Sequence, residues 1–396
     1  MRSMKRIVVL TMWLLGASVA LAQQWPRTVM RGDFEDPTMV RDGKDFYMTH
    51  SSFYDFPAFL IWHSTDLMNW TPLCRVVEDA WSGVAVCPLL QKEADGRYSL
   101  CFEVGDSLYR YEAEKPRGPW QRVSVSDAKG RKDFHDVFGA HKVVRVNDVK
   151  GQDYVVYHEA LKGYGSFGLQ TMVEPVKKDG GAWKSMADEL NRKNRKRNGG
   201  RFWRESSTKK LPEMRMRMND NFTSKKLGLQ WSLWGESSMN SVKIERGTLH
   251  LTACGKSPAD GRKLMTKAID KNYVVQVQVV PTAGNWSGLT LYADSRNFCG
   301  VLTDGKEFVI YQDGREKVRK KNPYKGKNCY LRMVNHRQRV RIQVSENGKR
   351  WETLEQGMDV SEYSQTGKNG VMAVRPGLVS CGQGEGMFRK FRYAVK

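Results

Sequence analysis

Three carboxylates of this chain stand where a folded protein could use them for chemistry. Asp36 immediately precedes Pro37, and Glu103 and Glu159 each follow a strongly apolar segment. Two carboxyl groups facing one pocket can share catalysis, because one can accept a proton from water while the other donates a proton to a leaving group. Structural roles compete with this interpretation, since Asp-Pro often caps a turn and a carboxylate at a strand end is often simply exposed.

The segments that would position these carboxylates have the pattern of short β-strands. Residues 24–176 alternate apolar or aromatic runs with Asp/Gly turn clusters; examples are the runs Phe59–Trp62, Tyr98–Phe102 and Tyr154–Tyr157 and the turns Arg41–Lys44 and Asp148–Gly151. This spacing is typical of an all-β sandwich, barrel or repeat.

Strands of a second type resume after about Met218. Apolar and polar residues alternate in segments such as Tyr273–Val280 and Arg339–Val344, and Asn-Gly and Asp-Gly turns separate the segments. Such alternation predicts a large antiparallel β-sandwich as a separate domain.

Between the two halves lies a basic segment. Residues 177–217 contain fourteen Lys or Arg against five Asp or Glu, in a chain whose formal net charge is +22. A run of this kind can bind nucleic acid, but it has no interleaved aromatic platform, so we predict a solvated linker and no nucleic-acid partner. Anionic polysaccharide or the cell surface is the partner class that the charge favours.

The N-terminus has the features of a cleavable export signal. Arg2, Lys5 and Arg6 precede an apolar stretch that ends in Ala20-Leu21-Ala22, and this stretch is too short to span a bilayer comfortably. We therefore predict a signal peptide over residues 1–22 and a secreted or periplasmic protein. No cysteine follows the cleavage site, which argues against a lipid anchor, and we predict no membrane span.

The seven cysteines are sparse and unevenly spaced, without a CxxC pair. A zinc site or a disulfide framework is therefore not expected, although an isolated disulfide after export would be compatible with the sequence.

Longer motifs resemble those of a known family. Gly32–Val40, which contains Asp36-Pro37, is followed by Asp45–Tyr47, Ser51–Pro57 and Ile61–Trp70 at the spacing of a first propeller blade. This succession resembles the N-terminal blade of family 43 glycoside hydrolases, the group of β-xylosidases and α-L-arabinofuranosidases. Asn219–Phe222, Leu227–Trp231 and Phe388–Tyr393 are similar to the concanavalin-like sandwich often appended to the family's β-xylosidases.

The resemblance implies an all-β fold with a shortened propeller. Residues 23–185 would form the glycoside hydrolase domain, 186–217 the basic linker and 218–396 the sandwich. Family propellers have five blades, but this stretch supplies only about three to four at 40 to 50 residues per blade. The middle blades are expected to be missing.

The resemblance also implies a mechanism and its residues. Inverting hydrolysis needs a general base and a general acid, and Asp36 matches the position of the base. Val86 stands at the position of the acid, so Glu103 and Glu159 are the available substitutes. Asp136 is a candidate third carboxylate that would tune the pKa of the acid.

Substrate contacts are partly retained. Phe53 is a candidate platform for a sugar ring, and His141 matches a last-blade histidine that could contact substrate or hold a calcium-associated water network; no other cofactor is expected. Leu169 replaces an arginine that contacts the sugar in the family. Two functions therefore stay open: a hydrolase of hemicellulose-type oligosaccharides or polysaccharides such as xylan and arabinan, and a catalytically impaired carbohydrate-binding relative or deletion relic.

Overall fold

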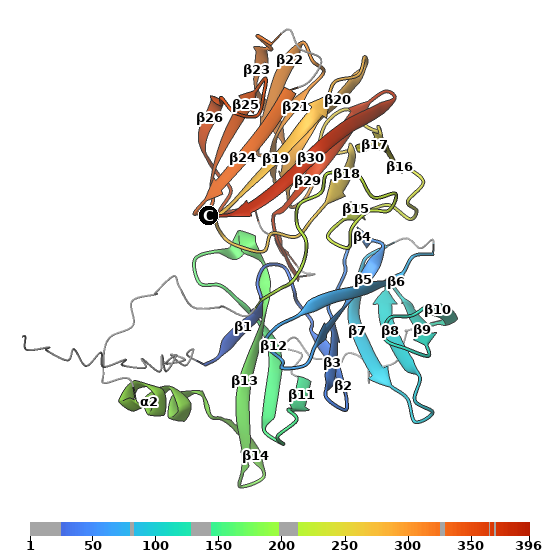
Figure 1. Cartoon of the computed structure of the whole chain (residues 1–396), viewed down its shortest axis with the longest axis vertical. Helices are drawn as coiled ribbons and strands as arrows, with labels where there is room; N and C mark the ends of the chain where they lie inside the picture. Colours follow the sequence, from blue (N-terminus) through green and yellow to red (C-terminus); the bar gives the residue numbers. More distant parts are fainter. Residues whose placement is uncertain are drawn as a thin grey trace, which may run out of the picture.

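The chain was analysed as a computed structural model, which describes residues 25–79, 83–127, 144–197, 213–324, 329–363, 365–367 and 370–396. β-Strands dominate these residues: three blade-like sheets lie together at one end, and a two-sheet sandwich stands at the other (Figure 1). The prediction of a shortened propeller followed by a sandwich is confirmed. All seven cysteines are free thiols.

Blade one contains the Asp36 motif and lies between the other two blades. Its antiparallel strand order is β2 (Thr38–Asp42), β3 (Asp45–Thr49), β5 (Ala58–Ser64) and β6 (Thr71–Val77). One face, including Met48 and Trp62, packs toward the last blade, and the other, including Ala58 and Ile61, packs toward blade two. Trp70 is fully buried, so the aromatic repeat of the motif serves the blade core.

Blade two packs apolar residues on the side that faces blade one. Its strands are β7 (Ala85–Lys92), β8 (Tyr98–Val104), β9 (Ser107–Ala113) and β10 (Gln121–Asp127). Leu100 and Phe102 join the shared core, whereas the other face carries ion pairs of Arg110 with Glu93 and Glu112 at 2.8 Å each. This distribution suits a blade with one packed neighbour.

The sheet of the last blade is completed by β1, the first strand of the domain. The sheet order is β1 (Arg27–Met30), β13 (Leu169–Asp179), β12 (Asp153–Ala160) and β11 (Val144–Asn147), with β14 (Ala182–Ser185) as a hairpin partner of β13. Arg41 of blade one donates to Asn147 Oδ1 at 2.6 Å and thereby ties the two blades together. The described residues thus form three blades where the family has five.

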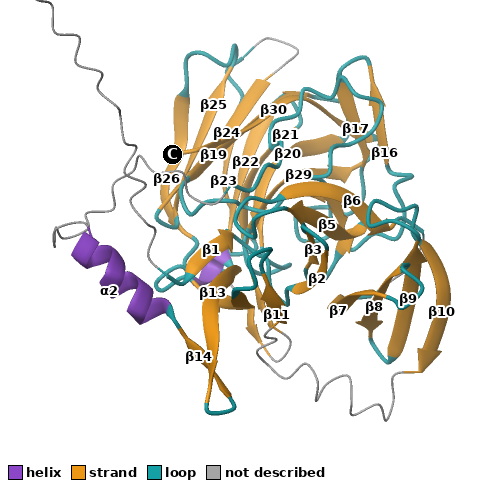
Figure 2. Cartoon of the chain, turned by 60° about the horizontal axis from the view of Figure 1, so that its bottom comes forward, coloured by secondary structure: helices purple, strands orange, loops and turns teal. Residues whose placement is uncertain are grey.

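Helix α2 (Ala187–Arg197) occupies the start of the segment that we predicted as a linker. Asp188 and Glu189 lie in its first turn, where acidic side chains favour the helix dipole. Asn191 fixes the helix to the first strand segment, because its side chain accepts from the Trp25 amide and donates to the Trp25 carbonyl, both at 2.8 Å. Figure 2 shows the helix beside the last blade. The acidic first turn and the Asn191–Trp25 contact therefore favour a helix, which the basic composition of the segment alone did not suggest.

The sandwich consists of an eight-stranded and a seven-stranded antiparallel sheet around one large core. The first sheet has the order β23 (Arg315–Lys321), β22 (Glu307–Gln312), β21 (Phe298–Thr303), β20 (Asn285–Tyr292), β29 (Arg375–Gly382), β18 (Arg262–Met265), β15 (Ser232–Trp234) and β4 (Asp55–Phe56). The second has the order β16 (Val242–Glu245), β17 (Thr248–Thr252), β30 (Glu385–Val395), β19 (Tyr273–Val280), β24 (Cys329–His336), β25 (Arg339–Ser345) and β26 (Glu352–Asp359).

The propeller and the sandwich share a sheet. Strand β4 lies within the first blade's sequence, between β3 and β5, yet it pairs with β15 of the sandwich. The two other short elements are the 3₁₀ helix η1 (Gly165–Phe167) and the hairpin of β27 (Gln365–Gly367) and β28 (Gly370–Met372). The two domains are therefore joined by backbone hydrogen bonds as well as by side chains.

Candidate active site

Asp36 lies in a loop that three parts of the molecule hold in place. The Phe34 amide donates to the Leu169 carbonyl of the last blade at 2.8 Å, and the Ser51 amide of blade one donates to the Glu35 carbonyl at 3.1 Å. Lys267 of the sandwich donates to the Asp33 carbonyl at 2.5 Å. Asp36 itself has a φ of 52°, a left-handed conformation that is costly for a residue with a Cβ. Strain of this kind persists only where the surroundings fix the backbone.

The Asp36 carboxylate is 24% exposed and has a defined orientation. Ser51 donates its hydroxyl proton to Asp36 Oδ2 at 2.6 Å, and the same Ser51 oxygen accepts the Cys87 amide of blade two at 3.1 Å. One serine therefore connects the carboxylate to two blades and leaves the other carboxylate oxygen, Oδ1, for further contacts.

His158 of β12 approaches Asp36 from the last blade. The Asp36 amide donates to His158 Nδ1 at 2.9 Å, and Asp36 Oδ1 lies 3.6 Å from the same nitrogen. In this contact Nδ1 acts as a hydrogen-bond acceptor. No role was assigned to His158 from the sequence, and Ser51 appeared there only within the Ser51–Pro57 motif.

Glu35 is a buried carboxyl group beside Asp36. It is 4% exposed, and its Oε1 has no hydrogen-bond partner among the described residues. Burial, together with the negative charges of Asp33 and Asp36, raises the pKa of Glu35 to about 9. Glu35 is therefore protonated at neutral pH, unlike an exposed glutamate.

Replacing Glu35 by glutamine is expected to stabilise the protein increasingly as the pH rises. In the unfolded chain a glutamate ionises near pH 4.5, whereas folded Glu35 keeps its proton up to about pH 9. The folded state thus binds more protons across this window, so wild-type stability falls with rising pH while Glu35→Gln cannot ionise. Urea unfolding should show nearly equal stability at pH 5 and an advantage of about 2 to 4 kcal/mol for Glu35→Gln at pH 8.

The exposed residue Glu362 offers a matched control for this experiment. Glu362→Gln should change the free energy of unfolding by less than about 0.5 kcal/mol at either pH. A constant difference between wild type and Glu35→Gln from pH 5 to pH 8 would show that Glu35 is ionised in the folded protein.

A buried ion cluster connects the Asp36 loop to the sandwich. Arg375, at the start of β29, donates from Nε to Asp33 Oδ2 at 2.9 Å and from Nη1 to Asp55 Oδ1 at 2.5 Å. Arg375 and Asp33 are each 1% exposed. Burial alone would raise the pKa of Asp33, but Arg375 and Lys267 hold it below its ordinary value. The cluster therefore fixes a charged residue three positions before Asp36.

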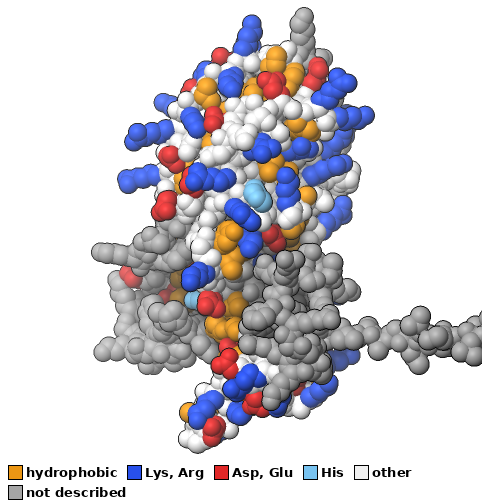
Figure 3. All heavy atoms as spheres, turned by 90° about the vertical axis from the view of Figure 1, so that its left-hand side faces the viewer, with side chains coloured by type: hydrophobic (Ala, Val, Ile, Leu, Met, Phe, Trp, Pro, Cys, Tyr) orange, Lys and Arg blue, Asp and Glu red, His pale blue; other side chains and the backbone are white. Residues whose placement is uncertain are grey.

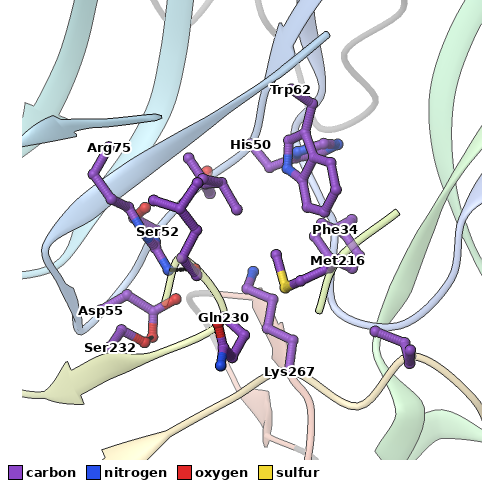
Figure 4. Close-up of a pocket in the computed structure, with 14 residues that line it drawn as sticks. Phe34, His50, Ser52, Asp55, Trp62, Arg75, Met216, Gln230, Ser232 and Lys267 are labelled. Carbon is purple, nitrogen blue, oxygen red and sulfur yellow. Dashed lines mark hydrogen bonds between the residues drawn. The ribbon is translucent and has the colours of Figure 1, made fainter. Parts of the chain in front are cut away.

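A small cavity lies next to this cluster, at the boundary of the two domains. In Figure 4 the Lys267 side chain extends between Met216 and Gln230, with Asp55 and Ser232 beyond. The open space is only about 30 Å³, far less than the 300 to 1,000 Å³ of typical ligand pockets. A sugar ring does not fit there, so this cavity is a packing defect of the joint rather than a substrate site.

Comparisons with known proteins match the two halves separately. The family model of Glycosyl hydrolases family 43 matches residues 26–133, and that of the Beta xylosidase C-terminal Concanavalin A-like domain matches residues 219–393. The first model describes family 43 hydrolases and the second describes the C-terminal domain of β-xylosidases, and the two matches follow one another in that order. The chain therefore resembles a shortened glycosyl hydrolase of family 43.

Relatives of known sequence match less than a third of the chain. A non-reducing end α-L-arabinofuranosidase of Bacteroides ovatus is 27% identical over 135 residues, which are 30% of this chain and 26% of that protein. A β-xylosidase of Bacillus subtilis is 31% identical over 131 residues, 28% of this chain and 24% of that protein. The matched segment thus spans about a quarter of the length of these family 43 relatives.

Solved structures show the same fold over a longer range. The family 43 BlXynB protein of Bacillus licheniformis aligns with a TM-score of 0.72 at 16% identity, covering 94% of this chain and 100% of that chain. A Bacteroides ovatus family 43 protein aligns equally well, with a TM-score of 0.72 at 15% identity, 94% coverage of this chain and 100% of that chain. The likeness supports the two-domain architecture.

The predicted acids Glu159 and Glu103 lie on β12 of the last blade and β8 of blade two. Glu159 neighbours His158 on β12, and successive strand residues point to opposite faces. Because His158 faces Asp36, Glu159 points away from it. Glu103, which is 7% exposed, pairs directly with Val86 in the β7–β8 register.

Of the remaining predicted residues, only Phe53 lies within the described part of the chain. Phe53 is 3% exposed and is held by backbone hydrogen bonds to Ala85 at 2.8 and 3.0 Å, so its ring is not available as a sugar platform; the predicted stacking role does not fit this burial. Asp136 and His141 lie outside the described residues, and the suggested calcium site stays a prediction. Within the described ranges, no three His, Cys, Asp or Glu side chains gather as metal ligands would.

Proposed function

We propose that this chain hydrolyses glycosidic bonds of xylan- or arabinan-type polysaccharides, as a β-xylosidase or α-L-arabinofuranosidase with Asp36 as general base. The observation that carries the proposal is the fixed, partly exposed Asp36 carboxylate, which Ser51 and His158 hold from two blades of a family 43 propeller. The proposed xylan or arabinan substrates correspond to the β-xylosidase and α-L-arabinofuranosidase names of the relatives.

The geometry suits Asp36 for activating a water molecule. Its Oδ2 is occupied by the Ser51 hydroxyl, so Oδ1 is the oxygen that would accept a proton from water. His158 Nδ1 accepts a hydrogen bond from the Asp36 amide and thereby holds the backbone beneath the carboxylate. Attack by such a water on the face of the sugar opposite the leaving group gives inversion.

Glu103 is the residue that we propose as the general acid. Directly opposed residues of an antiparallel pair have Cβ atoms about 4.5 to 5.5 Å apart and share one face of the sheet. Glu103 is opposed to Val86, the position where the family carries its acid, so a carboxyl group from the neighbouring strand could substitute for the missing one. Glu159 is disfavoured as the acid because it lies on the opposite face of β12 from His158, which faces Asp36.

Substituting Glu103 should affect substrates according to their leaving groups. Glu103→Gln is expected to lower kcat/KM for xylobiose by about 10²-fold or more, since a sugar alkoxide needs a proton to leave. Hydrolysis of 4-nitrophenyl β-xyloside should fall by less than about 5-fold, since the phenolate leaves unprotonated. Glu159→Gln is the control and should alter neither rate; equal losses on both substrates in Glu103→Gln would exclude a proton-donating role.

A binding function is the second candidate, and Val86 in place of the acid favours it. A folded wild type that binds xylo- or arabino-oligosaccharides but releases no 4-nitrophenol from aryl β-xyloside or aryl α-arabinofuranoside would establish this candidate. Release of 4-nitrophenol from either substrate would support the hydrolase.

We also propose that the chain is exported after removal of residues 1–22. Among the described residues, no helix has the length and apolar character needed to cross a membrane. N-terminal sequencing of the protein recovered from the producing cell's exterior or periplasm should begin at Gln23, and an intact Met1 would contradict this proposal.

A further inference from the structure

The sandwich has a hollow of its own on the outer face of the seven-stranded sheet. His250 of β17 and Met387 and Arg389 of β30 form its floor, pointing away from the buried core residues Leu249 and Phe388. Residues 222–225 and the turn at Arg246 and Gly247 form its walls. Its volume of about 880 Å³ is within the range that accommodates small oligosaccharides.

The side chains around the hollow leave an excess of positive charge. Glu245 is paired with Lys243 at 2.7 Å, and Glu385 is hydrogen-bonded to His250 at 2.5 Å. Lys225, Arg246 and Arg389 form no salt bridge within the described part of the chain, although the charge of Arg246 helps to lower the pKa of Glu245. Together with Lys243, four cationic side chains thus surround the hollow against two carboxylates. Other Lys and Arg side chains are spread over the sandwich, as the face in Figure 3 shows, but the hollow combines cations with a concave surface.

Arg389 is oriented before any ligand binds. Its Nε donates to Thr248 Oγ1 at 2.7 Å, and Thr248 is 3% exposed, so a buried hydroxyl fixes the plane of the guanidinium. Neither Nη nitrogen is hydrogen-bonded to another described residue, and a guanidinium presents such a pair to a carboxylate as two parallel hydrogen bonds.

We propose that this hollow binds oligosaccharides that carry a uronic acid, with Arg389 and Arg246 holding the sugar carboxylate. Met387 provides apolar surface for the C–H face of a neighbouring ring, and the hydroxyls of Thr223 and Ser224 are available to sugar hydroxyls. The site is on the sandwich and does not use Asp36, so it stands whether or not the propeller is catalytic.

Calorimetry with two matched ligands tests the proposal. The probes are xylotriose bearing one 4-O-methylglucuronic acid and unsubstituted xylotriose, titrated into the full mature chain at low and at 0.3 M salt. We expect the acidic ligand to bind at least about 10-fold more tightly at low salt, with this advantage reduced at 0.3 M, because salt screens exposed charges.

Substitutions identify the site. The double variant Arg246→Gln/Arg389→Gln should lose at least 10-fold in affinity for the acidic ligand and keep its affinity for the neutral one. Lys225→Gln, in the wall segment, should lose about 3-fold in affinity for the acidic ligand. This single variant replaces the double variant in the test if the double variant does not fold. Arg319→Gln on β23, a matched loss of charge elsewhere, and Asp36→Asn should bind as wild type does. Three results would overturn the proposal. They are equal affinities for the two ligands, wild-type affinity of the hollow variants for the acidic ligand, and polyphosphate that competes for the hollow as well as the acidic ligand does.

Discussion

Replacing Asp36 by asparagine is expected to reduce kcat on aryl β-xyloside or α-arabinofuranoside by about 10²- to 10⁴-fold. Asparagine keeps one side-chain oxygen, which can take the place of Asp36 Oδ2 and accept the Ser51 hydroxyl hydrogen bond, so the loop should keep its conformation. What is lost is the negative charge that takes a proton from water. KM should change little, because substrate contacts of the remaining side chains are retained.

Asp45→Asn is the matched control for this substitution. Asp45 lies in the same blade, on β3, and is hydrogen-bonded to His63 at 2.7 Å on the outer part of the sheet. The same chemical change there should leave kcat within about 2-fold, since an exposed pair contributes little. An Asp36→Asn enzyme that retains wild-type kcat would exclude Asp36 as the base.

Replacing Arg375 by methionine is expected to lower the free energy of unfolding by about 3 to 5 kcal/mol. The substitution leaves Asp33 and Asp55 buried without the guanidinium that compensates both charges. These carboxylates belong to the propeller, whereas Arg375 belongs to the sandwich, so the loss should weaken the joint between the domains and the Asp36 loop next to it. Urea unfolding at pH 7 provides the measurement.

Two further variants separate the ion cluster from general damage. Removing both buried carboxylate charges in the triple variant Arg375→Met/Asp33→Asn/Asp55→Asn should recover part of the lost stability, because neither carboxylate is left buried without the guanidinium. Arg319→Met, whose ion pairs with Glu307 and Glu316 lie on the surface, should cost less than about 1 kcal/mol. A cost that small for Arg375→Met as well would contradict the importance assigned to the cluster.

Local motifs explain what the sequence predicted correctly. The Asp-Pro and Trp elements of blade one follow one another within some forty residues, and period-two alternation marks the sandwich strands, so blade and sandwich were both accessible from neighbouring residues. Phe53 lies within the same motif, but its burial depends on the bridge to Ala85 of blade two, which local sequence does not reveal.

Contacts between distant segments explain what the sequence did not reveal. Arg375 is 342 residues from Asp33, and His158 is 122 residues from Asp36, so neither partner has a sequence signal. Glu35 resembles an exposed acid in sequence, and only the fold surrounds it with protein. The one local sign was three acidic residues, Asp33, Glu35 and Asp36, within an otherwise apolar turn.

The shortened propeller is compatible with a folded domain for a physical reason. Blade one contributes apolar side chains to both of its neighbours, and β1 completes the last blade, so the interior of the three-blade unit is covered. Blade two presents ion pairs on its other face. Loss of the middle blades therefore does not require an exposed apolar face there.

The most direct test of the account is ¹H NMR of xylobiose and of α-1,5-linked arabinobiose incubated with the purified mature chain. Hydrolysis with Asp36 as base predicts the inverted monosaccharide as the first product, α-xylose from xylobiose or β-arabinose from arabinobiose. A folded chain that binds either disaccharide but releases neither sugar would contradict the account and leave a carbohydrate-binding protein.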